Sequence, residues 1–388
     1  MSSERIEVEI SKLESGGKVM DASLLPKSVT IYDPGLARTA WCESAITQHG
    51  LGHLWFRGQR AADFVELGSI PALLRVLSGI ETRDDDSFVD RLDGLASMLD
   101  EMGIRDVVRA QGTELRATDI LARTLLGLAQ TVETAVSETD EALALPVAVR
   151  LILAEVTRER RGQNGKTEWV SARQSWAAPF VSGDSEARLL DQLLLWQADH
   201  QITCSTAALR VVASSGQRAF KSAIAGLIAW EGPKHAGATE NVADILCELA
   251  EGTDPSDLMN VFLDGGRRVP GFGHRLFRSE MTDERSLWLS QIRDECENAA
   301  NSPMLRAAKR FEGLVSEESY FRSRNLFPNP DWYNAQLMLF SGVDRRDLTG
   351  VQFAGRSLGF ASHWIEQRLD PATRMVRPRQ IDSIGIGN

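Results

Sequence analysis

Apolar residues recur at helical spacing along most of this chain. Within 239–250, for example, Val242, Ile245, Leu246 and Leu249 follow the i, i+3, i+4, i+7 pattern, so a helix there is expected to bury one face. The same spacing predicts helices over these segments: 69–79, 86–102, 116–136, 140–160, 184–199, 205–230, 239–250, 255–264, 283–321, 331–341 and 346–369.

Strand-like alternation is confined to the amino end, in segments 7–10, 28–32 and 46–57. Gly50 and Gly52 interrupt the last of these segments, which favours a turn between two strands. The pattern therefore predicts a mostly α protein with a few short N-terminal strands.

The length and composition are those of an ordinary globular chain. Its 388 residues suggest two or three domains and can bury a large core without metals or disulfides. A formal net charge of −11 and the lack of a clustered basic face argue against a nucleic-acid partner. The first 30 residues hold no long apolar run, so neither a signal peptide nor a membrane partner is expected. The four cysteines are widely separated and lack zinc spacing, so we expect reduced, buried thiols in a cytoplasmic protein.

Three of the six histidines lie beside small or backbone-breaking residues where predicted helices meet. His200 ends one helix, His235 follows Gly-Pro-Lys, and His274 closes a Pro-Gly-Phe-Gly run. A histidine on such a turn can present its ring to a cleft, and the dipole at a helix amino end disfavours its charged form. A neutral imidazole can then donate a hydrogen bond to a carbonyl or enol oxygen. The alternative for each turn taken alone is a plain connection between helices.

The other three histidines are interpreted as structural. His49 and His53 are four residues apart, which on a helix would place both rings on one side for metal binding. The glycines between them favour a turn instead, so no metal site is expected. His363 lies on the last predicted helix, where packed or interfacial histidines are common.

One carboxylate and two arginines complete a candidate site. Asp331 precedes an apolar helix and is either a helix cap or a partly desolvated carboxylate. Arg356 and Arg377 are either surface residues or clamps that bind carboxylates through their planar guanidinium groups. The residues alone therefore permit acid–base catalysis on an anionic substrate, and they do not name the reaction.

Six motifs in order along the chain resemble those of the citrate synthase family. They are Ala198-Asp-His200 with Ser205-Thr206, Gly232-Pro-Lys-His235, Pro270-Gly-Phe-Gly-His274-Arg275, Asn329-Pro-Asp331, Gly355-Arg356 and Arg377-Pro-Arg379.

This resemblance implies a two-domain helical subunit that closes over its substrates. The small domain would be 235–338, and the large domain would combine 1–234 with 339–388. The family works as a homodimer whose sites borrow a residue from the partner, and further assembly into hexamers is left open. The reaction would condense acetyl-CoA with oxaloacetate and hydrolyse citryl-CoA, as in the tricarboxylic acid cycle. An acyl-CoA is the co-substrate, and neither a metal nor a permanently bound cofactor is required.

The resemblance also implies a role for each catalytic candidate. Asp331 would remove a proton from the acyl methyl group. His235, in its neutral form, would donate a hydrogen bond to the thioester oxygen as the enol forms. His274 would protonate or polarise the ketone of the oxo acid. Domain closure would exclude water until condensation is complete.

The remaining candidates would bind the oxo acid. His200 would help to hold it, and Arg356 and the Arg377 of the other subunit would bind its carboxylates. The family has another arginine after an Asp-Pro pair. Arg285, in an Asp-Glu-Arg run, is the nearest match here, and Arg278 is the competing assignment.

The run after His235 departs from the family pattern. It reads Ala-Gly-Ala-Thr239-Glu, whereas the family usually has two glycines after the histidine and an asparagine before the glutamate. The alternatives are therefore an enzyme for another acyl-CoA or 2-oxo acid, such as a methylcitrate synthase or an enzyme that accepts a phosphonate analogue of oxaloacetate. An alternative of another class is a catalytically silent homologue that binds CoA esters. Retention of His235, His274 and Asp331 argues against the silent homologue.

Overall fold

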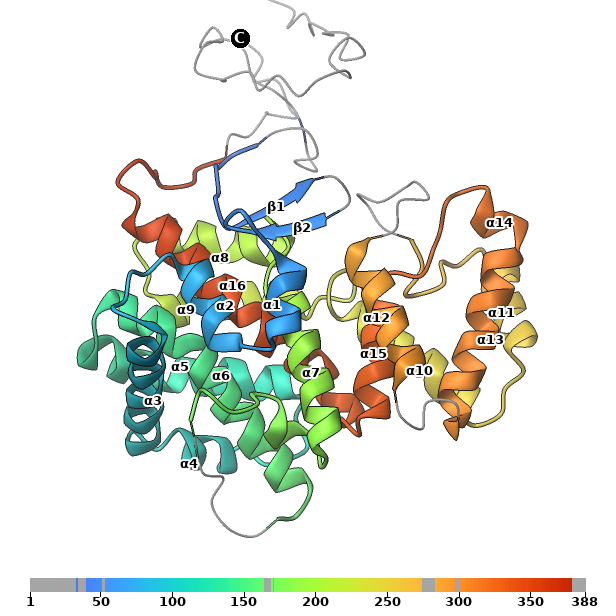
Figure 1. Ribbon diagram of the computed structural model, residues 1–388, viewed down its shortest axis with the longest axis horizontal. Coiled ribbons are helices and arrows are strands. Elements are labelled where there is room, and N and C mark those ends of the chain that lie inside the picture. Colours follow the sequence, from blue (N-terminus) through green and yellow to red (C-terminus); the bar gives the residue numbers. More distant parts are fainter. Residues whose placement is uncertain are drawn as a thin grey trace, which may run out of the picture. The chain divides into compact units, whose positions relative to one another are not determined.

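The computed structural model describes residues 33, 40–50, 53–163, 169, 171–273, 283–296 and 301–378 (Figure 1). It divides into two compact units, one of which is Ser44–Val376, while the other combines Met1–Glu43 with Arg377–Asn388. Every described helix and strand belongs to Ser44–Val376. The strands expected at 7–10 and 28–32 lie outside the described residues.

The strand segment predicted at 46–57 forms an antiparallel hairpin. Strand β1 (Thr47–Gly50) pairs with β2 (His53–Phe56), and β2 also pairs with the short β3 (Gln59–Arg60). The side chains of Leu54 and Phe56 point to the same face of β2 and are buried in the core, and this burial holds the hairpin against the helices.

The rest of the described chain is helical, and the expectation of a mostly α protein is confirmed. Its α-helices are α1 (Ala61–Leu67), α2 (Ile70–Ser78), α3 (Asp85–Glu101), α4 (Ile104–Arg109), α5 (Ala117–Ala135), α6 (Glu138–Arg160), α7 (Asp184–Gln197), α8 (Cys204–Ser214), α9 (Ala219–Trp230), α10 (Ala238–Ala250), α11 (Pro255–Asp264), α12 (Glu284–Glu295), α13 (Pro303–Glu317), α14 (Ser319–Arg322), α15 (Pro330–Phe340) and α16 (Leu348–Leu369). Short 3-10 helices lie at Ala178–Phe180 and Arg345–Asp347.

Two predicted helices prove to be interrupted. The segment 205–230 is divided into α8 and α9, because Gly216 takes a left-handed backbone conformation with φ of 98°. The segment 283–321 is divided into α12, α13 and α14, and Pro303 begins α13 after the capping residue Ser302. Helices α1 and α4 were not predicted, since seven and six residues are too few for a clear period.

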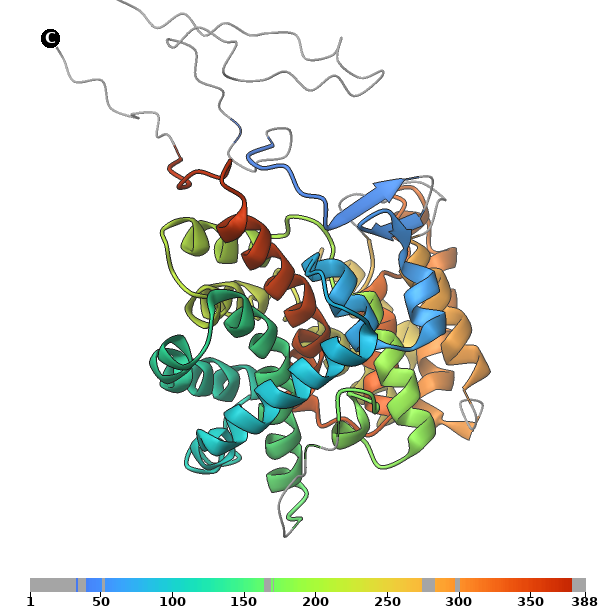
Figure 2. The same ribbon diagram turned by 60° about the vertical axis from the view of Figure 1, so that its left-hand side comes forward.

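Helix α16 is buried along nearly its whole length and packs against α2, α5, α6, α7, α8 and α9. In Figure 2 it is the red helix that runs among the blue and green ones. Its close approach to the end of α7 depends on glycine: a Cβ on Gly355 would lie 2.4 Å from the carbonyl oxygen of Leu194, and a Cβ on Gly359 would lie 2.3 Å from that of Ala198. This crossing brings Arg356 to the segment that contains Asp199 and is therefore central to the site.

Helices α10 to α15, drawn from yellow to orange, gather on one side of the unit in Figure 1. Helix α10 packs against α13 and α15, and α12 packs against α15. Phe272, Phe311 and Trp332 fill the space between them, with ring centroids 5.0 to 6.1 Å apart. These helices belong to the same compact unit as the others, and the proposed domain boundaries at 235 and 338 stay predictions.

The cysteines and the helix lengths bear on two earlier expectations. Cys204 is exposed, and Cys42, Cys247 and Cys296 are only partly buried, so the prediction of buried thiols is wrong for all four cysteines. Among the described residues, no helix combines the length and the apolar character needed to cross a membrane.

Candidate active site

The structure brings five of the predicted site residues into one region. His200 follows α7, His235 lies in the turn between α9 and α10, and Asp331 is in the first turn of α15. Arg356 comes from α16 and Arg285 from the first turn of α12. The positive charges of both guanidinium groups lower the pKa of Asp331, and that of Arg356 also lowers the pKa of His235. Residues distant in the sequence thus share one electrostatic environment.

Asp331 is a partly buried carboxylate rather than a helix cap. The cap of α15 is Asn329, whose side chain accepts from the backbone N–H groups of Asp331 at 3.0 Å and Trp332 at 3.4 Å. Burial raises the pKa of Asp331 to about 6, although the hydroxyl of Thr239, which donates to its Oδ1 at 3.2 Å, acts in the opposite direction. A carboxylate with this pKa is a stronger base than an ordinary aspartate and remains largely ionised at neutral pH.

His235 is neutral at physiological pH. Burial and the positive charge of Arg356 lower the pKa of its imidazole to about 4. The ring Nε2 lies 2.9 Å from Oγ of Ser205, and the ring packs edge-on against Trp230, with centroids 5.0 Å apart. These contacts fix the ring orientation and leave an imidazole that can act as a hydrogen-bond donor or acceptor.

Arg356 is buried, which excludes the alternative of a surface arginine. Its side chain lies over the ring of Trp230, 4.9 Å from the centroid, and its Nη1 is 3.8 Å from Oδ1 of Asp199. Within the described residues, Nε and Nη1 make no hydrogen bond. Burial lowers the pKa of Arg356 to about 10, so it still carries a positive charge at neutral pH. A buried guanidinium with uncommitted N–H groups can bind an anionic substrate.

Asp199 is a fully buried carboxylate that the sequence interpretation did not select. His363 contacts its Oδ1 through Nε2 at 3.1 Å, and the backbone N–H of Gln201 donates to Oδ2 at 3.0 Å. Burial alone would raise the pKa of Asp199, but His363 and Arg356 hold it below its usual value. His363 is itself fully buried, which agrees with its structural interpretation.

His200 lies between Arg285 and His49. Nη2 of Arg285 is 3.3 Å from Nε2 of His200, and since a guanidinium can only donate, Nε2 is the acceptor. The ring proton of His200 is then on Nδ1, which donates to Nε2 of His49 at 2.8 Å. Arg285 in turn is bound by Asp283, with Nη2 2.6 Å from Oδ2 and Nε 3.0 Å from Oδ1. His49, interpreted as a turn residue, therefore has a place in this site.

His274 and Arg278 lie outside the described residues. The carbonyl oxygen of Gly273, which precedes His274 in the sequence, accepts a hydrogen bond from Nδ2 of Asn329 at 2.9 Å, so Gly273 is held against the start of α15. Arg377 is exposed and belongs to the other compact unit. The catalytic and binding roles of all the predicted residues stay predictions.

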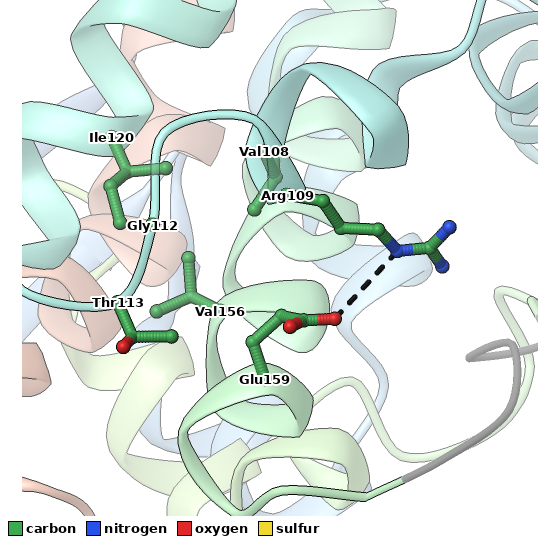
Figure 3. A pocket seen from close by; sticks show the side chains of 7 residues that line it. All are labelled: Val108, Arg109, Gly112, Thr113, Ile120, Val156 and Glu159. Carbon is green, nitrogen blue, oxygen red and sulfur yellow. Dashed lines mark ion pairs between the residues drawn. The ribbon is translucent and has the colours of Figure 1, made fainter.

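A small hollow elsewhere in the unit is shown in Figure 3. Arg109 and Glu159 form an ion pair there, with Nε 3.7 Å from Oε1. The lining residues are Val108, Arg109, Gly112, Thr113, Ile120, Val156 and Glu159. None of them is a predicted site residue, so this hollow is separate from the candidate active site.

Comparisons with known proteins agree with the fold and the motifs. The family model described as "Citrate synthase, C-terminal domain" matches residues 35–379. The chain belongs to the citrate synthase family. The citrate synthase of Corynebacterium glutamicum is 26% identical over 402 residues, which cover 97% of this chain and 91% of that protein.

Two further matches differ in what they cover. The peroxisomal citrate synthase of Dictyostelium discoideum is 33% identical over 196 residues, which are 50% of this chain and only 39% of that relative. A ternary complex of the Thermoplasma acidophilum citrate synthase with carboxymethyl coenzyme A and oxaloacetate has a TM-score of 0.78 at 19% identity, covering 91% of this chain and 96% of that one. At this identity the structural match shows the fold, and the expected citrate synthase-like helical fold is confirmed.

Proposed function

We propose that this protein is an acyltransferase that condenses acetyl-CoA with oxaloacetate and hydrolyses the resulting citryl-CoA. The observation that carries the proposal is Asp331, a partly buried carboxylate whose pKa is raised to about 6 and which interacts with the charges of Arg285 and Arg356, the second of which also acts on the neutral His235. The names of the relatives and the ligands of the Thermoplasma complex support the same chemistry.

In the first step Asp331 would take a proton from the methyl group of the acyl-CoA. The electron pair of that C–H bond becomes a C=C bond, the π pair of the carbonyl moves onto the thioester oxygen, and His235 donates a hydrogen bond that stabilises the resulting enolate. Ser205 supports this role, because its hydroxyl can donate to Nε2 and leave the ring proton on Nδ1 for the substrate.

In the second step the carbon of the enolate attacks the ketone carbon of the oxo acid, the carbonyl re-forms at the thioester, and the ketone oxygen takes a proton from His274. Arg356 supports binding of the oxo-acid carboxylates through the N–H groups that stay uncommitted among the described residues. Arg285 and His200 would complete that site, together with Arg377 of the partner subunit. Water then cleaves the thioester C–S bond and releases the CoA thiol.

A homodimer belongs to this proposal, because Arg377 is assigned to the site of the other subunit. The packed pair α8 and α9 supports it: Val211 on α8 is 40% exposed and Ile228 on α9 is 60% exposed. Such exposed apolar side chains are available for burial in an interface between subunits. Closure of the small domain 235–338, a cytoplasmic location and a place in the tricarboxylic acid cycle are part of the same proposal.

The test is an assay of CoA thiol release over a matrix of substrates. Acetyl-CoA and propionyl-CoA are each combined with oxaloacetate, another 2-oxo acid and a phosphonate analogue of oxaloacetate. We expect the highest kcat/KM for acetyl-CoA with oxaloacetate. A preference for another pair would assign the chain to one of the alternative enzymes, and CoA-ester binding without any thiol release would make it a silent homologue.

A further inference from the structure

The hydroxyl of Thr239 lies between Asp331 and Gln352. Its Oγ1 is 3.2 Å from Oδ1 of Asp331, 3.1 Å from Nε2 of Gln352 and 3.3 Å from Oε1 of Gln352. Thr239 is on the first turn of α10, Asp331 on α15 and Gln352 on α16. The side chains of Thr239 and Gln352 are buried, at 0% and 1% exposure, so solvent does not compete for these hydrogen bonds.

A threonine hydroxyl has one proton to donate, so its three contacts cannot all be donated bonds. When Asp331 is ionised, it can only accept. Thr239 then donates to Oδ1 of Asp331, and Nε2 of Gln352 donates to Oγ1 of Thr239. This is a chain of two hydrogen bonds that runs from the amide through the hydroxyl to the carboxylate.

When Asp331 is protonated, the same atoms can form the chain in the opposite direction. The carboxylic acid O–H, carried on Oδ1, donates to Oγ1 of Thr239, and Thr239 donates to Oε1 of Gln352. The amide of Gln352 places both a donor and an acceptor within reach of the hydroxyl. Reversal therefore requires only that the hydroxyl proton rotates, with the heavy atoms in place.

We propose that Thr239 and Gln352 are positioning residues that form a reversible hydrogen-bond relay, which stabilises Asp331 both before and after it takes the substrate proton. The proposal deepens the proposed function and rests on it for the role of Asp331 as the base. It also gives a role to Thr239, which occupies a position where the family usually has asparagine.

The relay, which is made of neutral side chains, differs from the charged groups that act on Asp331. Arg285 and Arg356 favour the ionised carboxylate, and Asp283 disfavours it. These are fixed charges, so each helps one protonation state at the expense of the other. A hydroxyl that can reverse its direction keeps a hydrogen bond in both states, and the bond to the ionised form is the stronger one.

The decisive variant is Thr239→Val, which keeps the shape of the side chain and removes the hydroxyl. Because the stronger hydrogen bond to the ionised form is lost, the pKa of Asp331 should rise by roughly one unit. We expect kcat at neutral pH to fall by about twofold or more, because a pKa near 7 leaves only about half of Asp331 ionised and the carboxylate loses a contact that positions it. Thr239→Ser should restore the pKa and most of kcat. The KM for the oxo acid should change little, because neither residue is assigned to that substrate.

Two further variants separate the relay from general effects on packing. Gln352→Met removes the amide at similar length and should shift the pKa of Asp331 in the same direction by a smaller amount. Thr349→Val is the matched control. Like Thr239, Thr349 is a buried threonine, but it lies on α16 and its hydroxyl donates to Glu240 at 3.0 Å instead of to Asp331. It should leave the titration of Asp331 unchanged. If Thr239→Val does not fold, Gln352→Met and Thr239→Ser decide the question.

The pKa of Asp331 is best measured without turnover, by carbon NMR of the chain labelled at aspartate carboxyl carbons, with Asp331→Asn to assign the signal. An unchanged titration in both Thr239→Val and Gln352→Met overturns the relay, as does a serine variant that behaves like the valine variant. If the wild-type chain releases no CoA but these shifts occur, the relay stands and the proposed function falls. If the chain is active and the shifts are absent, the function stands and the relay falls.

Discussion

Glu284 accepts a hydrogen bond from the backbone N–H of Leu54 at 3.0 Å, so the first residue of α12 is bound directly to strand β2. The same carboxylate accepts from Nη2 of Arg60 at 2.6 Å and lies 3.0 Å from Nδ1 of His53. Glu284 stands between Asp283 and Arg285 in the sequence. It therefore links the N-terminal hairpin to the helix that carries a proposed substrate-binding arginine.

We expect Glu284→Ala to weaken binding of the oxo acid. Without this carboxylate, the hairpin and α12 lose three contacts at the junction where His49, His200 and Arg285 meet. A net loss near 1 kcal/mol corresponds to a KM that is about fivefold higher, with kcat nearly unchanged. Steady-state kinetics measure the effect, and Glu295→Ala at the exposed end of the same helix is the control. Equal KM values for the two variants would remove Glu284 from substrate binding.

Activity should depend on the ionisation of Asp331. Because the base must be ionised and burial raises the pKa of Asp331 to about 6, kcat/KM should be full above that pH and fall as the pH decreases through it. Burial and Arg356 lower the pKa of His235 to about 4, so His235 stays neutral through this range. Its titration therefore does not contribute to the decrease of kcat/KM near pH 6. The pH profile of CoA release measures the midpoint. A midpoint near 4 would assign the limb to a group other than Asp331.

Arg377 should complement the site of the partner subunit in a homodimer. Chains with Arg377→Ala and chains with Asp331→Asn are each expected to be inactive. Mixing them should restore part of the activity, because one of the two sites in a hybrid dimer combines an intact Asp331 with an intact Arg377. Mass spectrometry of the intact dimers verifies the mixing. Mixed dimers without any recovered activity would show that the site is not shared.

The crossing of α16 and α7 should not tolerate a larger residue at Gly359. A Cβ there would lie 2.3 Å from the carbonyl oxygen of Ala198, so Gly359→Ala forces the helices apart and should lower the free energy of unfolding by about 1–3 kcal/mol. Gly94 on α3 is the matched control, since a Cβ there meets nothing within 4 Å. Gly94→Ala should raise stability by about 0.5–1 kcal/mol. Urea denaturation compares the two, and equal stabilities would contradict the close packing.

The helices were largely predictable from sequence, because burial of one face imposes a period that single residues reveal. The stripe from Val242 to Leu249 does form the buried face of α10. The breaks within 205–230 and 283–321 were missed, since apolar spacing continues across a turn whose direction depends on the backbone conformation of Gly216 or on Pro303.

The candidate site was predictable only in part. Asp331 and Arg356 stand in motifs, and their burial agrees with functional rather than surface roles. His49 and Gln352 carried no signal, because their importance comes from contacts with His200 and Thr239 across 151 and 113 residues of sequence. Periodicity and local motifs contain no information on such pairs. Thr239 did give a signal, as a departure from the family pattern, but its partner could be identified only from the structure.

The central claim is that Asp331 is the base that begins condensation. The most direct measurement compares CoA release by the wild-type chain and by Asp331→Asn, with acetyl-CoA binding to both measured by calorimetry. The account predicts that the asparagine variant binds acetyl-CoA with nearly unchanged affinity and loses at least about a thousandfold in kcat. A variant that binds acetyl-CoA and releases CoA at the wild-type rate would contradict it.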